Sequence, residues 1–266
     1  PVPINLREEQ FRQGTRDIVL MDAPANPAQP YVDLNTAMEM ALDPDDRIDY
    51  GAGRMYSHLP SSSFSLPVDS AAVAASGMLT PEEMKHMVSS VDWSIADNNG
   101  RPKAYVLKNQ FMVLNILLNN NWERPIYFAV TIGPDSYMGL SDYFRLEGLA
   151  WRLVPIKYGL HQGQPSGVST ELMYRNVMED FQYGGMEGER EIHMDESNRR
   201  MATNIRLQLT HLSQALLDEG DAPRALNVLE RMLASTPPHN VPYTRVLLPT
   251  VQLYFDLAGD ESLSAA

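Results

Sequence analysis

The sequence predicts an α/β fold of mixed α+β character, with a small, mainly parallel sheet followed by a helical C-terminal region. Short β-rich runs alternate with helical runs over the first 160 residues. From residue 195 onward, apolar residues recur at helical spacing instead. We therefore divide the chain into an α/β domain (1–160), a connecting helix and glycine-rich loop (161–194), and a helical region (195–266).

The composition disfavours several classes of function. Hydrophobic residues make up 44% of the 266 residues, which is enough for a buried core. The formal net charge of −13 disfavours binding to nucleic acid or anionic lipid. The absence of cysteine excludes disulfides, thiolate nucleophiles and cysteine-based zinc sites. The longest apolar run, 111–118, is far shorter than the roughly 20 residues of a membrane span. Since no signal-peptide pattern follows Pro1, we expect a soluble piece of a longer protein.

The first hundred residues predict short elements separated by turns. They predict a helix at 33–42 and strands at 15–21, 55–60, 63–68 and 91–96, with a hairpin as one arrangement of the second and third strands. The run TPEE predicts a further helix, because Thr80 can cap it and Glu83 can close a capping box. We expect this helix to continue to about residue 90.

The run NNNWERPIYFAVTIG, from Asn119 to Gly133, marks a junction between a helix and a strand. Residues 111–118 predict a helix that is apolar most of the way round and therefore buried, with Asn109 as its N-cap. The asparagines that follow tolerate the left-handed conformation that ends helices, and Pro125 blocks further helix. The nearly uncharged run 126–132 then predicts a strand covered on both faces.

A second strand is expected soon after the first. Residues 133–136 predict a turn, residues 142–148 a short helix capped by Ser141 or Asp142, and residues 149–157 a strand. Because a helical crossover between two strands places them side by side in the same direction, this order favours parallel pairing.

The sequence after residue 160 predicts four helices, the connecting helix at 170–181 and three in the helical region at 195–219, 222–234 and 245–258. Its small, large and turn residues follow tetratricopeptide spacing over about half of one repeat: Gly220, Asp221, Ala225, Leu229, Met232 and Pro237. The second and third of these helices therefore resemble a tetratricopeptide hairpin. Since such repeats need about three copies to be stable alone, we expect the hairpin to pack on the α/β part or on sequence outside this chain.

Four segments carry a wider resemblance: QFRQGTRDIV, NNWERPIYFAVTI, YMGLSDYFRLEGLAWRLVPIK and MYRNVMEDFQYGGM. Together they resemble the soluble C-terminal region of a family of bacterial multi-pass membrane proteins, which carries a domain of unknown function and is grouped with protein O-mannosyltransferase-like glycosyltransferases. The resemblance covers essentially the whole chain. It implies an extracytoplasmic, periplasmic accessory domain at the inner membrane, whose partner is the membrane-embedded part of the same protein. It also implies that the catalytic residues, which use a lipid-linked sugar donor, lie in that part and have no counterpart here.

Polar and aromatic residues around the predicted junction form the candidate ligand site. Asp135 and Tyr137 follow the C-terminal end of the predicted buried strand, where open α/β sheets bind ligands. Aromatic faces beside acids and arginines suit a sugar or a peptide, and hence a glycan or an acceptor protein. The candidate residues are Trp122, Arg124, Asp135, Tyr137, Tyr143, Arg145, Glu147 and Arg152.

These residues also have structural interpretations, because Trp122 can fill the junction and Glu147 can pair with an arginine. The leading hypothesis is a non-catalytic docking domain. One alternative is a carbohydrate-active enzyme with Asp135 and Glu147 as acid and base, and another is a purely structural scaffold. The six histidines include no i, i+4 pair and no HExxH motif, so we expect no metal site, and no motif indicates a cofactor.

Overall fold

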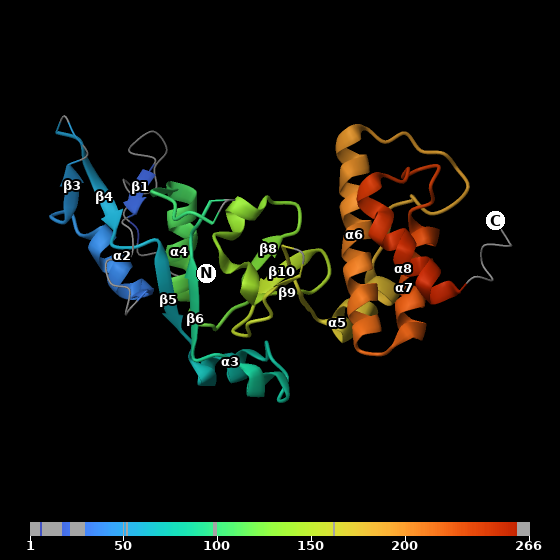
Figure 1. The fold of residues 1–266 in the computed structure, drawn as a ribbon, viewed down its shortest axis with the longest axis horizontal. Helices are drawn as coiled ribbons and strands as arrows, with labels where there is room; N and C mark the ends of the chain where they lie inside the picture. Colours follow the sequence, from blue (N-terminus) through green and yellow to red (C-terminus); the bar gives the residue numbers. More distant parts are fainter. Residues whose placement is uncertain are drawn as a thin grey trace. The chain divides into compact units, whose positions relative to one another are not determined.

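The computed structural model describes residues 6, 18–21, 30–49, 51, 53–97, 100–161 and 163–259 (Figure 1). The described residues form two compact units, each assembled from several stretches of the chain. Unit 1 takes its residues from Pro1–Ile126, Ile132–Phe144 and Leu153–Ser166. Unit 2 takes its residues from Tyr127–Thr131, Arg145–Arg152 and Gly167–Ala266. The chain therefore passes between the units five times.

Small sheets of mixed direction organise unit 1. The first has the order β3-β4-β1-β7 and consists of β3 (Arg47–Asp49), β4 (Met55–Leu59), β1 (Ile18–Met21) and β7 (Tyr105–Leu107). The second has the order β2-β5-β6 and consists of β2 (Val32–Asp33), β5 (Ser63–Pro67) and β6 (Ser90–Ser94). Strands β11 (Leu160–His161) and β12 (Gln164–Pro165) form an antiparallel pair. Parallel pairs (β1 with β4, β2 with β5) thus occur beside antiparallel ones (β1 with β7, β5 with β6).

This arrangement corrects two predictions. The sheets are mixed, so the prediction of a mainly parallel sheet is wrong. The hairpin of residues 55–60 and 63–68 is also wrong, because β4 and β5 belong to different sheets. Strand β5 pairs with β6 instead, and Phe64 lies opposite Trp93 with ring centroids 5.7 Å apart. Such an aromatic pair contributes about 0.5–1.5 kcal/mol beyond its burial and thereby favours this pairing.

The predicted helices of unit 1 are confirmed in part. Helix α2 (Leu34–Leu42) is capped by Asp33, whose side chain accepts a hydrogen bond from the N–H of Thr36 at 3.0 Å. Helix α4 (Lys108–Asn120) buries Phe111, Leu114 and Leu117, as expected for an apolar helix. Its N-cap is Leu107 rather than the predicted Asn109, and the Leu107 N–H donates to Oε1 of Gln110. A short helix, α3 (Ser70–Ser76), was not predicted.

The predicted capping box at Thr80 is present, but the predicted helix is much shorter. The Thr80 N–H donates to Oε2 of Glu83 at 2.7 Å, and the Glu83 N–H donates to Oγ1 of Thr80 at 3.2 Å. Only a 3₁₀ turn follows, Glu83–His86, because the chain becomes extended at Met87 and enters β6 at Ser90. Pairing with β5 therefore prevails over the local helix signal.

The helix-to-strand junction is confirmed, although the strand is not buried on both faces. Asn121 and Trp122 end α4 in left-handed conformations, with φ of 45° and 59°. Strand β8 spans only Tyr127–Ala129, and its Tyr127 and Ala129 are exposed while Phe128 is buried. The chain turns away directly after Ala129, so the apolar residues that follow do not extend the strand.

Unit 2 contains a sheet of order β13-β9-β10-β8, to which β9 (Phe144–Leu146), β10 (Ala150–Leu153) and β13 (Gly167–Val168) contribute. Strands β8 and β10 are antiparallel, so the predicted parallel pairing is wrong. The reason is that residues 142–148 form no crossover helix: a 3₁₀ turn, Leu140–Tyr143, leads directly into β9. Gly148 turns the chain towards β10 with φ of 117°, and a Cβ there would lie 3.2 Å from the Phe181 ring.

The C-terminal part of unit 2 is helical, as predicted. Helix α5 (Thr170–Arg175) continues as a π-helical turn, Asn176–Asp180. Helices α6 (Glu196–Asp218), α7 (Ala222–Ser235) and α8 (Leu248–Ala258) lie side by side (Figure 1). A 3₁₀ turn, Arg245–Leu247, precedes α8. The tetratricopeptide-like character of the α6–α7 hairpin stays a prediction.

Five apolar residues recur at helical spacing along α6, namely Met201, Ile205, Leu209, Leu212 and Leu216, and the sequence predicts that they form one stripe. The packing face of α6 is shorter than this stripe. Leu209, Leu212 and Leu216 are buried, whereas Met201 is 52% exposed and Ile205 is half-buried. The end of the helix nearer to residue 196 therefore presents apolar side chains that the helical packing does not cover. Among the described residues, no helix combines the length and the apolar character that crossing a membrane requires.

Candidate functional site

Several predicted site residues hold unit 1 together. Trp122 is buried, and its indole N–H donates to the carbonyl oxygen of Pro67 at 2.9 Å. The Tyr143 hydroxyl is also buried and lies 3.2 Å from both the N–H and the carbonyl oxygen of Asp92. Tyr137 packs edge-on against Phe144, with ring centroids 5.1 Å apart. These three aromatic side chains therefore stabilise the fold and present no open face to a ligand.

Arg124 and Asp135 lie at the surface. Asp135 forms an exposed ion pair with Lys103 at 3.2 Å, and Arg124 is exposed. Asp135 does follow β8 in the chain, but β8 pairs antiparallel with β10, so the rule for ligands at the ends of parallel strands does not apply. Asp135 belongs to unit 1 and Glu147 to unit 2, and their action as an acid–base pair stays a prediction.

The structure brings three predicted residues together on the sheet of unit 2. Arg145 of β9 donates to Oε1 of Glu147 through Nε at 3.0 Å and also through Nη2. Arg152 of β10 approaches Oε2 of Glu147 to 3.4 Å. Tyr127 completes the cluster, since its hydroxyl donates to the same Oε2 at 2.7 Å. We call Tyr127, Arg145, Glu147 and Arg152 the sheet network.

The three charged side chains of the sheet network are almost fully buried. The side chain of Glu147 is 2% exposed, that of Arg145 is 5% and that of Arg152 is 13%. Two guanidinium groups face one carboxylate, and the Tyr127 ring lies 5.8 Å from Cζ of Arg152. Burial, reinforced by the hydrogen bond to Glu147, raises the pKa of the Tyr127 hydroxyl. Because both Glu147 oxygens accept bonds from cations or a hydroxyl, the carboxylate serves as the counterion of the two arginines.

Tyr127 is not among the predicted site residues, although the three residues it joins in the sheet network are. It lies opposite Arg152 in the register of β8 and β10, which brings it to Glu147 from a strand far away in the sequence. The sequence signal was present but weak: alternation along β8 places Tyr127 and Ala129 on the same face. Only the antiparallel register reveals which residues that face meets.

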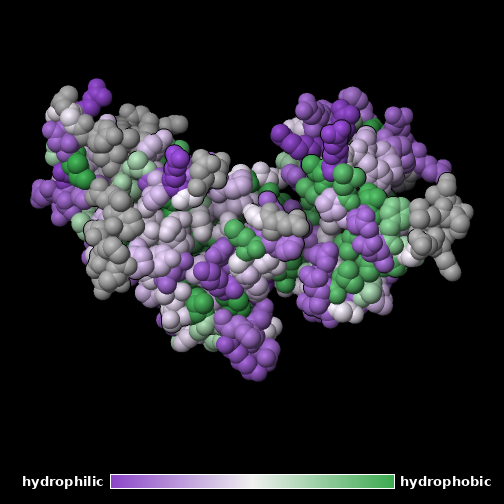
Figure 2. Space-filling view, viewed as in Figure 1, coloured by the Kyte–Doolittle hydropathy of each residue, from purple (hydrophilic) through white to green (hydrophobic). Residues whose placement is uncertain are grey.

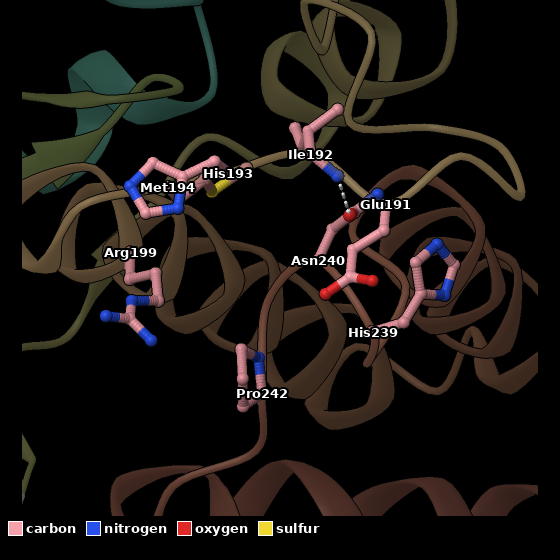
Figure 3. Close-up of a pocket in the computed structure, with 8 residues that line it drawn as sticks. All are labelled: Glu191, Ile192, His193, Met194, Arg199, His239, Asn240 and Pro242. Atoms are coloured by element: carbon pink, nitrogen blue, oxygen red, sulfur yellow. Dashed lines mark hydrogen bonds between the residues drawn. The ribbon is translucent and has the colours of Figure 1, made fainter.

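Two adjoining cavities lie in the helical part of unit 2, and the sequence predicted neither. The first, called the polar cavity here, has a volume of about 470 Å³ (Figure 3). Its walls consist of Glu191, Ile192, His193, Met194, Arg199, His239, Asn240 and Pro242. The second, called the methionine cavity, has a volume of about 400 Å³. Its walls consist of Gln182, Tyr183, Gly184, Met186, Ile192, Met194, Asn198, Met201, Ala202 and Ile205.

Asn240 fastens the loop that forms one wall of both cavities. Its Oδ1 accepts a hydrogen bond from the Ile192 N–H at 2.8 Å, and its Nδ2 donates to the carbonyl oxygens of Met186 and Arg190. Asn240 is itself buried. At the same loop, Nε2 of His239 lies 2.9 Å from the carbonyl oxygen of Gly188. We refer to residues 182–194 as the wall loop.

A buried arginine positions the chain next to Asn240. Arg206 of α6 is fully buried, and it donates to Oγ1 of Thr236 at 2.9 Å and to the carbonyl oxygen of the same residue. Its guanidinium lies 4.8 Å from the centroid of the Tyr243 ring. Burial lowers the pKa of Arg206. These contacts tie the chain on either side of residues 237–242 to α6, so the opposite wall of the polar cavity is fixed as well.

The polar cavity offers groups of both charges. In Figure 3, His193 and Arg199 lie on one side of the cavity, and Glu191 and His239 lie on the other. Within the described ranges, no group of three or more acidic or histidine side chains is arranged to hold a metal ion. The lining can therefore donate hydrogen bonds from one side and accept them on the other, as a polar or charged ligand group requires.

Comparison with known families adds one finding. The sequence model of the family described as TMEM260-associated domain 2 matches residues 1–172. The match includes every described strand and ends in the first turn of α5. No curated protein and no solved structure matches the chain.

Proposed function

The chain belongs to the TMEM260-associated domain 2 family, and from this membership we propose that it is a non-catalytic accessory domain of a membrane protein. Its task is to dock an acceptor protein, a glycan or another partner. The membrane-embedded part of the same protein then carries out the chemistry, as a glycosyltransferase of the protein O-mannosyltransferase type. The domain works on the extracytoplasmic side of that membrane, which is the periplasmic side in a bacterium.

The pair of cavities in unit 2 is the observation that carries the docking function. Cavities of about 470 and 400 Å³ fall within the range of roughly 300–1,000 Å³ that binding sites occupy. Their walls combine apolar side chains with a few charged and histidine side chains, which is the usual composition of a specific binding site.

The sheet network supports a non-catalytic role. A general acid or base must exchange a proton with a substrate, which requires an accessible carboxyl group. Glu147 is almost fully buried, and its two oxygens are taken by Arg145, Arg152 and Tyr127. Asp135, the other carboxylate considered for catalysis, is exposed and paired with Lys103. Both carboxylates therefore already have structural partners.

The decisive experiment uses the chain as it stands. Purified protein is screened on glycan and peptide arrays, and in parallel it is incubated with glycoside and glycosyl-donor substrates to detect turnover. We expect saturable binding without turnover. Robust turnover by the isolated chain would overturn the proposal, as would the absence of binding to every array.

A further inference from the structure

We refer to the adjoining polar cavity and methionine cavity together as the groove. They share Ile192 and Met194 as lining residues, so they lie next to each other along the wall loop. The groove therefore has a charged end, with Glu191 and Arg199, and an apolar end, with Met201 and Ile205. Figure 2 shows apolar surface bordered by hydrophilic surface over the helical part of unit 2.

The apolar end is lined by flexible side chains. Met186, Met194 and Met201 all contribute to the methionine cavity, and Met201 is 52% exposed. Methionine is unbranched and adapts its shape to different apolar partners, so methionine-rich surfaces are frequent where a protein accommodates varied side chains. An apolar side chain of a ligand would cover Met201 and gain the burial that packing within unit 2 does not provide.

The charged end presents a cation that has no ion-pair partner in the described part of the chain. Arg199 forms no ion pair with any residue that the structure describes. His193 lies on the same side of the cavity (Figure 3). Because the chain as a whole carries a formal charge of −13, an acidic ligand is repelled by most of the surface and attracted at few places. Arg199 would thus fix where along the groove an acidic group binds.

We propose that the groove binds an extended peptide segment of a partner protein, in which an apolar side chain enters the methionine cavity and a neighbouring acidic side chain pairs with Arg199. This rests on the proposed docking function and specifies its ligand as a peptide. Two adjoining cavities of unlike chemistry match the alternate side chains of an extended chain, which supplies apolar and charged groups at short, regular spacing. Glu191, on the opposite side from Arg199, disfavours a second acidic group there.

The test is a selection from a displayed library of random peptides, carried out with the wild-type chain and with three variants. Wild type is expected to select an apolar residue two positions away from an Asp or Glu, because alternate side chains of an extended chain lie on the same face. Arg199→Glu should replace this acidic preference with Lys or Arg and weaken the wild-type-selected peptides at least about tenfold. This variant should remain folded, because an acidic residue near the start of α6 interacts favourably with the helix dipole.

Arg200→Glu is the matched control, since Arg200 is exposed and does not line either cavity. It makes the same change of charge one residue away and should alter affinity less than about twofold, because exposed charges are screened by solvent and salt. Met201→Gln should weaken the preference for an apolar residue while the acidic preference remains.

The outcomes separate this inference from the proposed function. If Arg199→Glu does not weaken binding of the selected peptides, or if Arg200→Glu weakens it equally, the assignment of the peptide to the groove is overturned. The proposed docking function would then remain, with its site elsewhere on the chain. Binding to glycan arrays together with failure to select any peptide would overturn the peptide ligand alone. If neither arrays nor library give a ligand, both proposals fail.

Discussion

The hydroxyl of Tyr127 donates a hydrogen bond of 2.7 Å to Oε2 of Glu147, joining an exposed aromatic side chain to a buried carboxylate. Through this bond the sheet network reaches the surface, while Arg145 and Arg152 hold the carboxylate from within. The network therefore allows predictions about stability at neutral pH and at alkaline pH.

Replacing Glu147 by Gln is expected to destabilise the protein strongly. The substitution preserves side-chain volume but leaves two buried guanidinium groups without their counterion, so we expect a loss of about 3–5 kcal/mol in the free energy of unfolding. Urea denaturation measures this loss. Asp135→Asn is the control, because breaking the exposed pair with Lys103 should cost at most about 1 kcal/mol. Equal losses in the two variants would contradict a structural role for Glu147.

Tyr127 is expected to make stability depend on alkaline pH. Burial and the bond to Glu147 raise the pKa of Tyr127 in the folded protein above its ordinary value of 10.0. The folded state therefore favours the protonated hydroxyl, and this contribution is complete below pH 10 and is lost as the pH rises through the raised value. Between pH 9 and 11.5, Tyr127→Phe should lose less stability than wild type in urea titrations. Identical pH profiles would refute the assignment.

Arg224 is expected to make stability depend on acidic pH. It donates to Glu171 of α5 at 2.7 Å and to Asp221, the N-cap of α7, at 2.6 Å. The hydrogen bonds from Arg224 lower the pKa values of both carboxyl groups. Their contribution is therefore present at neutral pH and is lost as the pH falls below about 4.5. Arg224→Gln should flatten the decline of stability between pH 6 and pH 3, and an unchanged slope would count against these bonds.

Asn240→Ala is expected to loosen the wall loop while the rest of the chain stays folded. The substitution removes the two hydrogen bonds that the Asn240 side chain donates and the one that it accepts, each worth about 1 kcal/mol. Hydrogen exchange at the Ile192 amide should become at least about tenfold faster. Asn227→Ala removes an exposed asparagine of α7 and serves as the control. Unchanged protection of Ile192 in Asn240→Ala would show that other contacts hold the loop.

Two glycines of positive φ should respond differently to replacement by alanine. At Gly139, with φ of 81°, an added Cβ would lie 2.1 Å from the carbonyl oxygen of Ser94. At Gly220, with φ of 87°, the space is open. Gly220→Ala should therefore cost only the left-handed penalty of about 1–2 kcal/mol, and Gly139→Ala should cost more. Thermal or urea unfolding compares the two, and a larger loss at Gly220 would contradict the close approach at Gly139.

Local signals in the sequence predicted helix boundaries better than sheet pairing. The N-caps of α2, α6 and α7 are Asp33, Asp195 and Asp221, and each caps a helix whose start the sequence places correctly. Capping involves residues within three positions of each other, so a short window suffices. Pairing of β5 with β6 instead of β4 depends on contacts made across long separations, which a single sequence does not specify.

The candidate site shows the same difference between local contacts, which the sequence predicts, and long-range contacts, which it does not. Glu147 and Arg145 are two residues apart, and the sequence predicts pairing of Glu147 with an arginine as the structural alternative to ligand binding. The contribution of Tyr127 required the register of β8 and β10. The groove was beyond prediction because its wall loop is held by Asn240, which lies about 50 residues away along the chain and carries no motif.

The five crossings of the chain between its units limit how the protein can be divided. Strand β8, and most of β9 and β10, come from segments that precede the last stretch of unit 1 in the sequence. No single peptide bond can be cut so that each fragment contains one whole unit. A recombinant fragment that begins at Gly167 would contain all the helices of unit 2 but three strands fewer, and it would lack Glu147 together with both of its arginines. Truncation therefore cannot produce either unit alone, and the function of each unit is better tested by substitutions in the intact polypeptide.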